Sequence, residues 1–209
     1  GAVGQDRIGG GEYELRARHI INATGPWVDD IREMDRSKEC KTLRLTKGVH
    51  LVFDQERFPL RQAVYFDTPD GRMVFAIPRD GKTYIGTTDT DYAGDPGHPR
   101  MEADDLSYLL DAANYMFPSL RLTPRDVESS WAGLRPLIRQ EGKNPSDISR
   151  KDEIFLSPSG LISIAGGKLT GYRKMAERVV DLVSRRRQAD GLPALPASRT
   201  RTLAISGGD

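Results

Sequence analysis

Cysteine and histidine are scarce in this chain. Its 209 residues include one cysteine, Cys40, which excludes a disulfide framework and a zinc site built from several cysteines. The histidines His19, His50 and His98 show neither HxxH nor HExxH spacing, so we expect no metal site. Cys40 lies in a charged segment, and we expect it in an exposed loop without a nucleophilic role.

The chain also lacks long apolar runs and an excess of charge of either sign. No apolar run approaches the roughly 18–20 residues that a membrane span requires, and no secretory signal precedes the first predicted strand. With 31 basic and 30 acidic residues, the chain predicts no nucleic-acid partner. We therefore expect a cytoplasmic protein, with peripheral contact to a membrane left open. Arginines 185–187, 199 and 201 are a local exception, typical of a basic last helical turn, with a membrane or nucleic-acid patch as the alternative.

The most informative feature that is present is a glycine-rich turn from a strand into a helix. An apolar strand at residues 161–165 ends in Gly166-Gly167, and Lys168 precedes a helix that runs to about residue 187. Free backbone N–H groups and the positive end of the helix dipole suit an anion or a ring oxygen, and Lys168 adds a full charge. The pattern predicts a ligand site, with close strand–helix packing as the alternative. The predicted apolar stripe of the helix comprises Leu169, Tyr172, Ala176, Val179, Val180 and Val183.

The remaining pattern predicts an α+β fold. A short helix at 27–34 follows Gly25-Pro26, where proline takes a favoured first helical position. A second, amphipathic helix has Asp104 and Asp105 in its first turn and ends before Pro118. Asp-Gly turns separate alternating segments, which predicts consecutive antiparallel hairpins. Residues 1–11 are expected to form a loop. Strands are expected at residues 12–17, 18–24, 43–53, 63–67, 72–78, 82–88, 127–138, 153–157 and 161–165.

Two strand-then-glycine turns flank the antiparallel segment, and five motifs occur in a fixed order. They are residues 22–27 (NATGPW), 47–50 (KGVH), 86–90 (GTTDT), 132–137 (AGLRPL) and 166–170 (GGKLT). Together they resemble the flavin-dependent glycerol-3-phosphate dehydrogenases and the related glycerophosphate oxidases, from about residue 12 to residue 183. Any one motif alone is weak, whereas five in sequence are specific.

The resemblance implies an antiparallel substrate-binding sheet inserted into an FAD-binding α/β domain of the glutathione-reductase or amino-acid-oxidase type. Residues 1–34 would end the FAD-binding domain, 35–165 would form the substrate sheet, 166–187 the returning FAD-domain helix, and 188–209 a linker to a C-terminal domain. The family's N-terminal GxGxxG, its acidic ribose-binding residue, its N-terminal substrate arginine and its C-terminal helical domain are not in this sequence. We therefore expect a central fragment that by itself retains no FAD and is inactive.

The resemblance also implies a set of site residues. Lys168 would contact the substrate phosphate as a point charge, and the N–H groups of Leu169 and Thr170 would face the flavin pyrimidine carbonyl. The implied cofactor-binding residues are Thr24, Gly25, Gly167, Lys168, Leu169 and Thr170. Trp27 lies beside them in the first motif, where a place in the core is an equal alternative. The resemblance implies no metal ligands.

Two further residues carry the implied chemistry. Arg135, on an otherwise apolar strand, would lie near the reacting carbon and bind substrate, with a structural salt bridge as the alternative. His50 would accept the hydroxyl proton as general base, with a purely structural histidine as the alternative. Residues 86–89 would either approach the substrate or form a turn held by their own side chains.

The implied reaction is the oxidation of sn-glycerol 3-phosphate to dihydroxyacetone phosphate, with hydride transfer to FAD and electrons passed to quinone. The implied partners are glycerol 3-phosphate, a quinone, the cytoplasmic face of the inner membrane and a second copy of the chain. A glycerophosphate oxidase, another amino-acid-oxidase-like flavoenzyme and a non-catalytic binding module are the alternatives.

Overall fold

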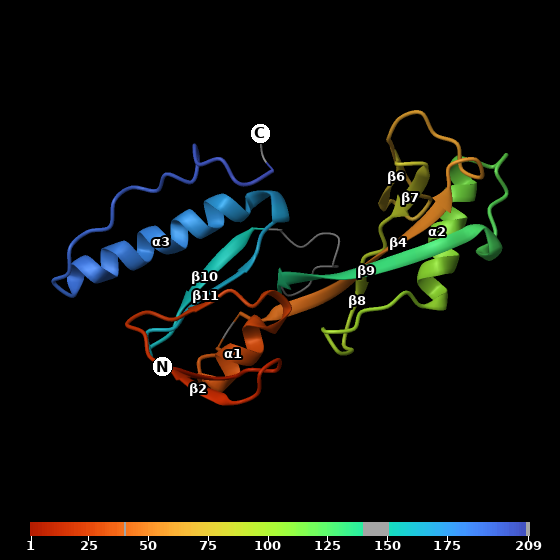
Figure 1. The fold of residues 1–209 in the computed structure, drawn as a ribbon. Helices are drawn as coiled ribbons and strands as arrows, with labels where there is room; N and C mark the ends of the chain where they lie inside the picture. The colour runs from red at the N-terminus through yellow and green to blue at the C-terminus, as the bar shows by residue number, and fades with distance from the viewer. Residues whose placement is uncertain (40, 140–150, 208–209) are drawn as a thin grey trace. The chain divides into compact units, whose positions relative to one another are not determined.

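The computed structural model describes residues 1–39, 41–139 and 151–207 (Figure 1). The expectation for Cys40 lies outside the described residues. The chain divides into two compact units, one of Gly1–Leu43 with Ser149–Asp209 and the other of Arg44–Ile148.

The first unit is built on a small mixed sheet. Its strand order is β10 (Asp152–Leu156), β11 (Ile162–Gly166), β3 (Ile21–Asn22), with β10 antiparallel and β3 parallel to β11. Short helices η1 (Gly25–Trp27) and α1 (Val28–Met34) follow β3, and η4 (Leu169–Gly171) with α3 (Tyr172–Ala189) follow β11. A separate hairpin pairs β1 (Ala2–Gln5) with β2 (Glu12–Leu15). Its side chains are mostly exposed.

The second unit is an antiparallel sheet covered by one long helix. Its strands are β4 (Leu43–Asp54), β5 (Val64–Asp67), β6 (Met73–Arg79), β7 (Lys82–Gly86), β8 (Thr90–Asp91) and β9 (Val127–Ile138), with η2 (Pro124–Asp126) before β9. They pair in the order β5-β6-β7-β4-β8, and β9 also pairs with β4. Alternate residues of β4, Val49, Leu51 and Phe53, are fully buried with residues of α2 (Ala103–Met116), because successive side chains of a strand point to opposite faces. His50 and Val52 lie on the other face of β4.

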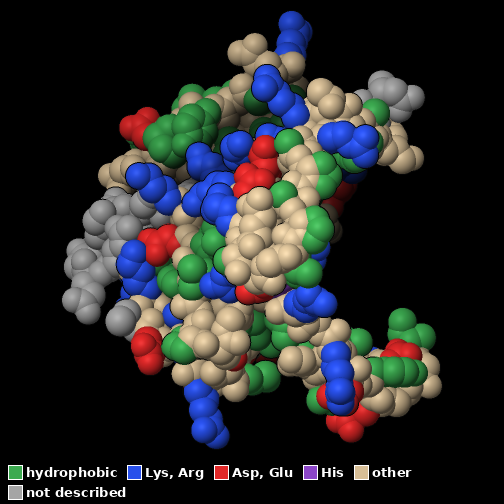
Figure 2. Space-filling view, turned by 90° about the vertical axis from the view of Figure 1, so that its left-hand side faces the viewer, with side chains coloured by type: hydrophobic (Ala, Val, Ile, Leu, Met, Phe, Trp, Pro, Cys, Tyr) green, Lys and Arg blue, Asp and Glu red, His purple; other side chains and the backbone are tan. Residues whose placement is uncertain are grey.

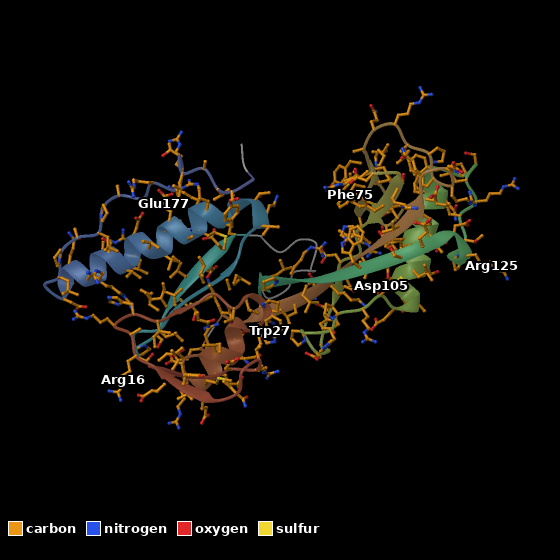
Figure 3. All side chains as sticks on the ribbon, viewed as in Figure 1. Arg16, Trp27, Phe75, Asp105, Arg125 and Glu177 are labelled. Carbon is orange, nitrogen blue, oxygen red and sulfur yellow. The ribbon has the colours of Figure 1, made fainter. Side chains whose placement is uncertain are left out.

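A buried ion pair joins β4 to the start of α2. Lys47 Nζ lies 2.7 Å from Asp105 Oδ2, and both side chains are 3% exposed. Asp105 also accepts the backbone N–H of Glu102 at 2.9 Å and so completes the capping box of α2. Figure 3 labels Asp105 on this helix. The lysine of the KGVH motif is therefore part of the packing between sheet and helix.

These elements confirm the expected α+β class, with its antiparallel sheet and its α/β part. The structure differs from the expected boundary at residue 165. The β10–β11 hairpin pairs with β3 in the first unit, because its apolar residues Ile162 and Ile164 pack on α3. The inserted sheet thus ends with β9. The expected loop at residues 1–11 is also wrong in part, since residues 2–5 form β1.

The core-facing side of α3 differs from the predicted stripe. Met175, Val179, Leu182 and Val183 pack against the sheet, so two residues of the predicted stripe, Val179 and Val183, are placed correctly. Leu169, Tyr172 and Val180 are instead 89%, 60% and 46% exposed. The apolar residues of this helix occupy more than one face, and its 3.6-residue period could not decide which of them faces the sheet.

The basic end of α3 fits the helix-end interpretation. Arg186 and Arg187 lie in its last turn, and Arg186 donates to the backbone oxygen of Gly160 at 3.0 Å. On the face shown in Figure 2, Lys and Arg side chains are numerous but Asp and Glu side chains lie among them. None of the described helices is long and apolar enough to cross a membrane.

Candidate functional site

The two glycine turns of the first unit leave from neighbouring parallel strands. β3 and β11 are paired with Ile21 opposite Ile162 and Asn22 opposite Ser163. Thr24-Gly25 follows the carboxyl end of β3, and Gly167 to Thr170 follows the carboxyl end of β11. Ligands of open α/β sheets bind outside the carboxyl ends of the strands. The structure therefore brings the predicted cofactor-binding residues together at one edge of one sheet.

Asn22 fixes the first of these turns. Its side chain is buried, and its Nδ2 donates to the Val28 backbone oxygen at 2.9 Å and to Ser163 Oγ at 3.1 Å. Its Oδ1 accepts from Thr24 Oγ1 at 2.8 Å. Asn22 was not predicted to have a role within its motif. The available signal was a polar residue at the end of an apolar strand, directly before a glycine turn.

The glycines of both turns have left-handed backbone angles, but their surroundings differ. Gly25 has φ +61, and no atom lies within 4 Å of the position where a Cβ would stand. A Cβ at Gly167, which has φ +78, would lie 2.7 Å from Met175 Sδ. Gly167 thus serves close packing of the turn on α3, which was the alternative interpretation. Gly25 leaves space that a ligand could fill.

The turn after β11 exposes both a cation and backbone donors. Lys168 has an extended backbone and an exposed side chain, and its oxygen accepts the N–H of Gly171 at 2.8 Å. Among the described residues, none accepts a hydrogen bond from the N–H of Leu169 or Thr170. Trp27 in η1 is 41% exposed, so it is not a core residue of this unit (Figure 3). The edge offers two N–H donors, one ammonium group and apolar surface.

In the second unit, His50 lies on the sheet face opposite α2, among aromatic rings. Its ring stacks on Trp131 with centroids 4.6 Å apart and an angle of 13°. The ring centroid of His50 lies 5.7 Å from that of Phe75 and 6.2 Å from that of Tyr84. Figure 3 labels Phe75 on β6. The face borders a cavity of about 500 Å³. The cavity is lined by His50, Val52, Phe75, Ile77, Arg79, Asp80, Lys82, Tyr84 and Trp131.

The surroundings of His50 keep its imidazole neutral. Burial, and secondly the positive charge of Arg135, lower the pKa of His50 from 6.5 to about 4. Its Nδ1 is buried and has no hydrogen-bond partner among the described residues. A neutral imidazole has a free lone pair for a proton, as a general base must, but a pKa of about 4 makes it a weaker base than an ordinary histidine. It cannot bind a phosphate as a cation at pH 7.

Arg135 is held by the segment that follows β7. Its Nη1 lies 3.3 Å from Asp89 Oδ1 and donates to the Thr88 oxygen at 3.3 Å, and its Nη2 donates to Thr87 Oγ1 at 3.1 Å. This salt bridge to Asp89 is the predicted structural alternative for Arg135. The side chain is 24% exposed, so it remains accessible to a small ligand as well.

The predicted site residues thus form two groups. Thr24, Gly25 and the segment from Gly167 to Thr170 lie in the first unit, whereas His50 and Arg135 lie in the second. Within the part of the chain that the structure describes, no cluster of three His, Cys, Asp or Glu side chains could hold a metal ion.

Comparisons with known proteins show the family of the chain. Residues 2–173 match the family described as FAD dependent oxidoreductase (DAO). The chain is 62% identical over 208 residues to the aerobic glycerol-3-phosphate dehydrogenase of Bacillus subtilis (strain 168) and 59% identical over 206 residues to that of Staphylococcus aureus (strain USA300). It covers 38% and 37% of those proteins, while they match 100% and 98% of this chain.

A solved structure resembles the chain over nearly its whole length. The glycerol-3-phosphate dehydrogenase from Bacillus halodurans, complexed with FAD, is 60% identical with a TM-score of 0.85. The match covers 99% of this chain and 38% of that one. The family match extends over most of the chain and includes both glycine turns and the inserted sheet. The chain belongs to the family of FAD dependent oxidoreductases.

Proposed function

We propose that this chain is the central part of an FAD-dependent dehydrogenase that oxidises sn-glycerol 3-phosphate to dihydroxyacetone phosphate. The observation that carries the proposal is the 62% identity, over the whole chain, to a protein named aerobic glycerol-3-phosphate dehydrogenase. The chain spans about 38% of that relative's length, so the activity is assigned to a longer polypeptide that contains this segment. For this segment alone we expect neither retention of FAD nor activity.

The edge formed by the two glycine turns fits part of a flavin. The open space at Gly25 and the unpartnered N–H groups of Leu169 and Thr170 suit a planar ring with acceptor oxygens. The exposed side chain of Leu169 and the half-exposed ring of Trp27 supply apolar surface near these donors. When bound, FAD supplies the hydride acceptor. In this proposal, residues 1–34 and the helix α3 belong to the FAD-binding domain and the inserted sheet binds substrate.

The charged residues divide the remaining tasks. Lys168 binds the substrate phosphate, because its ammonium group is exposed beside a turn with free N–H donors. Arg135 orients the carbon that is oxidised. His50, neutral at pH 7, accepts the hydroxyl proton at its imidazole. The aromatic face around His50 excludes water from this step, since Trp131 covers one side of the ring.

The electrons pass to a quinone, and the longer protein attaches to the cytoplasmic face of the inner membrane as a peripheral homodimer. The names of the relatives favour the dehydrogenase over the glycerophosphate oxidase. Parallel assays of the complete polypeptide with a quinone analogue and with oxygen separate the two, because an oxidase would form peroxide without the quinone.

The direct test measures the complete polypeptide for flavin absorbance and for oxidation of glycerol 3-phosphate. Lys168→Ala should raise KM at least 10-fold with kcat changed little, because the lysine contributes uniform binding of the phosphate. Lys174→Ala is the matched control: this lysine is exposed on α3 and pairs with Glu177 at 2.8 Å. Unchanged KM in Lys168→Ala would remove the phosphate role. Absence of flavin, or faster turnover of an amine than of glycerol 3-phosphate, would contradict the proposed function.

A further inference from the structure

We propose that Asp89 is a positioning residue for Arg135: its carboxylate, with Thr87 and the Thr88 oxygen, sets the direction in which the guanidinium meets the substrate. The inference rests on the proposed function, in which Arg135 touches the reacting molecule. Asp89 itself acts only through Arg135.

Three consecutive residues hold one guanidinium group. Asp89 Oδ1 lies 3.3 Å from Nη1, the Thr88 oxygen accepts from the same nitrogen at 3.3 Å, and Thr87 Oγ1 accepts from Nη2 at 3.1 Å. The Asp89 side chain is 13% exposed and that of Arg135 24%. Partial burial strengthens such a pair relative to an exposed one, because less water screens it. Contacts at two separate nitrogens fix the plane of the group as well as its place.

The segment that holds Arg135 is itself tied to β4. Thr88 is buried, and its Oγ1 accepts the N–H of Val49 at 3.0 Å and donates to the Lys47 oxygen at 3.4 Å. The position of Asp89 is therefore set by the strand that also carries His50. A side chain as long as arginine loses much rotamer freedom when it is fixed in this way.

Gly48 shows how closely the guanidinium approaches this strand. A Cβ on Gly48 would lie 2.5 Å from Thr87 Oγ1 and 2.6 Å from each terminal nitrogen of Arg135. Any other residue at position 48 would displace the guanidinium or Thr87. The glycine of the KGVH motif, the threonine and aspartate of the GTTDT motif and the arginine of the AGLRPL motif thus form one arrangement. The arrangement explains why residues of three motifs that are separate in the sequence lie together in the fold.

The test is a double-mutant cycle in the complete, FAD-loaded polypeptide, with kcat/KM for glycerol 3-phosphate as the readout. Asp89→Ala should lower kcat/KM about 10- to 100-fold, as misplacement of a positioning group by about 1 Å does. In an Arg135→Ala background the same change should lower it less than about 2-fold, because Asp89 then has nothing to position. Asp89→Asn, which keeps an acceptor oxygen, should recover part of the loss.

Asp95→Ala provides the matched control. Asp95 lies six residues further along the chain and pairs with His98 at 2.7 Å, with 66% of its side chain exposed, so its removal should leave kcat/KM unchanged. Gly48→Ala perturbs the same guanidinium from β4 and should reproduce the loss of Asp89→Ala with flavin content unchanged. Losses that multiply in the double variant would show a role of Asp89 that is independent of Arg135 and would overturn the inference.

A second readout does not depend on activity. Crystal structures of the complete polypeptide and of its Asp89→Ala variant should show the Arg135 guanidinium displaced in the variant. An unmoved guanidinium would overturn the positioning role even if the protein did not oxidise glycerol 3-phosphate. Absence of that oxidation with a displaced guanidinium would instead refute the proposed function and leave the positioning contact confirmed.

Discussion

The buried pair between Lys47 and Asp105 permits a quantitative prediction. Replacing Lys47 by methionine keeps most of the side-chain volume but leaves the Asp105 carboxylate, 3% exposed, with the N–H of Glu102 as a partner and without its cation. Breaking a buried pair on one side costs about 3–5 kcal/mol, because an uncompensated charge stays buried. The double variant Lys47→Met, Asp105→Leu removes both charges. It should unfold within about 1–2 kcal/mol of the wild type, the residual loss being the cap of α2.

Urea unfolding at pH 7, followed by tryptophan fluorescence, measures these differences. Lys47→Met should lower the midpoint by about 1 M or more. Lys82→Met is the control, because Lys82 pairs with Asp54 and Glu128 at 2.8 Å while these side chains are 42–44% exposed. An exposed pair contributes about 1 kcal/mol or less. A loss of stability in Lys47→Met no larger than that in Lys82→Met would contradict the cost assigned to an uncompensated buried charge.

The same pair predicts a dependence on alkaline pH. Burial lowers the pKa of Lys47, but the hydrogen bonds and charges of Asp105 and Glu102 outweigh it and raise the pKa above 10.5. The stabilisation is therefore fully present below the ordinary lysine pKa and is lost as pH rises through the folded-state value. Lys47→Met should lack this alkaline component of the urea midpoint.

Three further changes test the remaining geometry. Asn22→Ala should lower the free energy of unfolding by about 2–3 kcal/mol, because it removes buried hydrogen bonds that hold the turn after β3. Urea unfolding measures this loss of stability. A loss below about 1 kcal/mol would contradict the role of Asn22 in holding the turn. Gly25→Ala should lower the free energy of unfolding by only about 1–2 kcal/mol, since φ is +61 and the space is open, yet reduce the flavin content of the complete protein. Full flavin content would contradict a role of Gly25 in flavin binding. His50 has a folded pKa of about 4 against 6.5, so stability should fall as pH decreases from about 6.5 to about 4. In His50→Gln this acidic component of the urea midpoint should disappear, and its persistence would assign it to other groups.

The sequence predicted most elements of the fold for local reasons. Asp-Gly turns at positions 70–71 and 80–81 delimit the strands β5, β6 and β7, and the apolar faces of β4 and α2 follow their own periods. The strand β2 was expected within residues 12–17, but its partner β1 escaped prediction because its side chains are mostly exposed and no apolar alternation marks it. The place of the β10–β11 hairpin could not be predicted, because pairing with β3 joins residues about 140 positions apart and leaves no local pattern.

Long separation also limited the prediction of the site. Arg135 and Asp89 were both in recognised motifs, but their contact spans 46 positions, and neither motif indicates the other as its partner. Lys47 was in a motif beside His50, although its partner in α2 makes it a structural residue. The chemistry of each residue type was predictable from the sequence, whereas its partner required the fold.

Exposure separates the motif residues that can touch a ligand from those that hold the fold. Asn22, Lys47 and Thr88 are buried, and each bonds to groups of its own unit. Thr24, Lys168, Leu169 and Thr170 are exposed. The polar groups at this edge of the sheet must therefore form hydrogen bonds with water or with a ligand. A motif residue with internal partners is accounted for by the fold alone. The Leu169 side chain is exposed beside N–H donors that have no partner among the described residues, so its own unit stabilises neither the side chain nor the donors. A flavin bound at that edge would supply both the apolar contact and the acceptor oxygens.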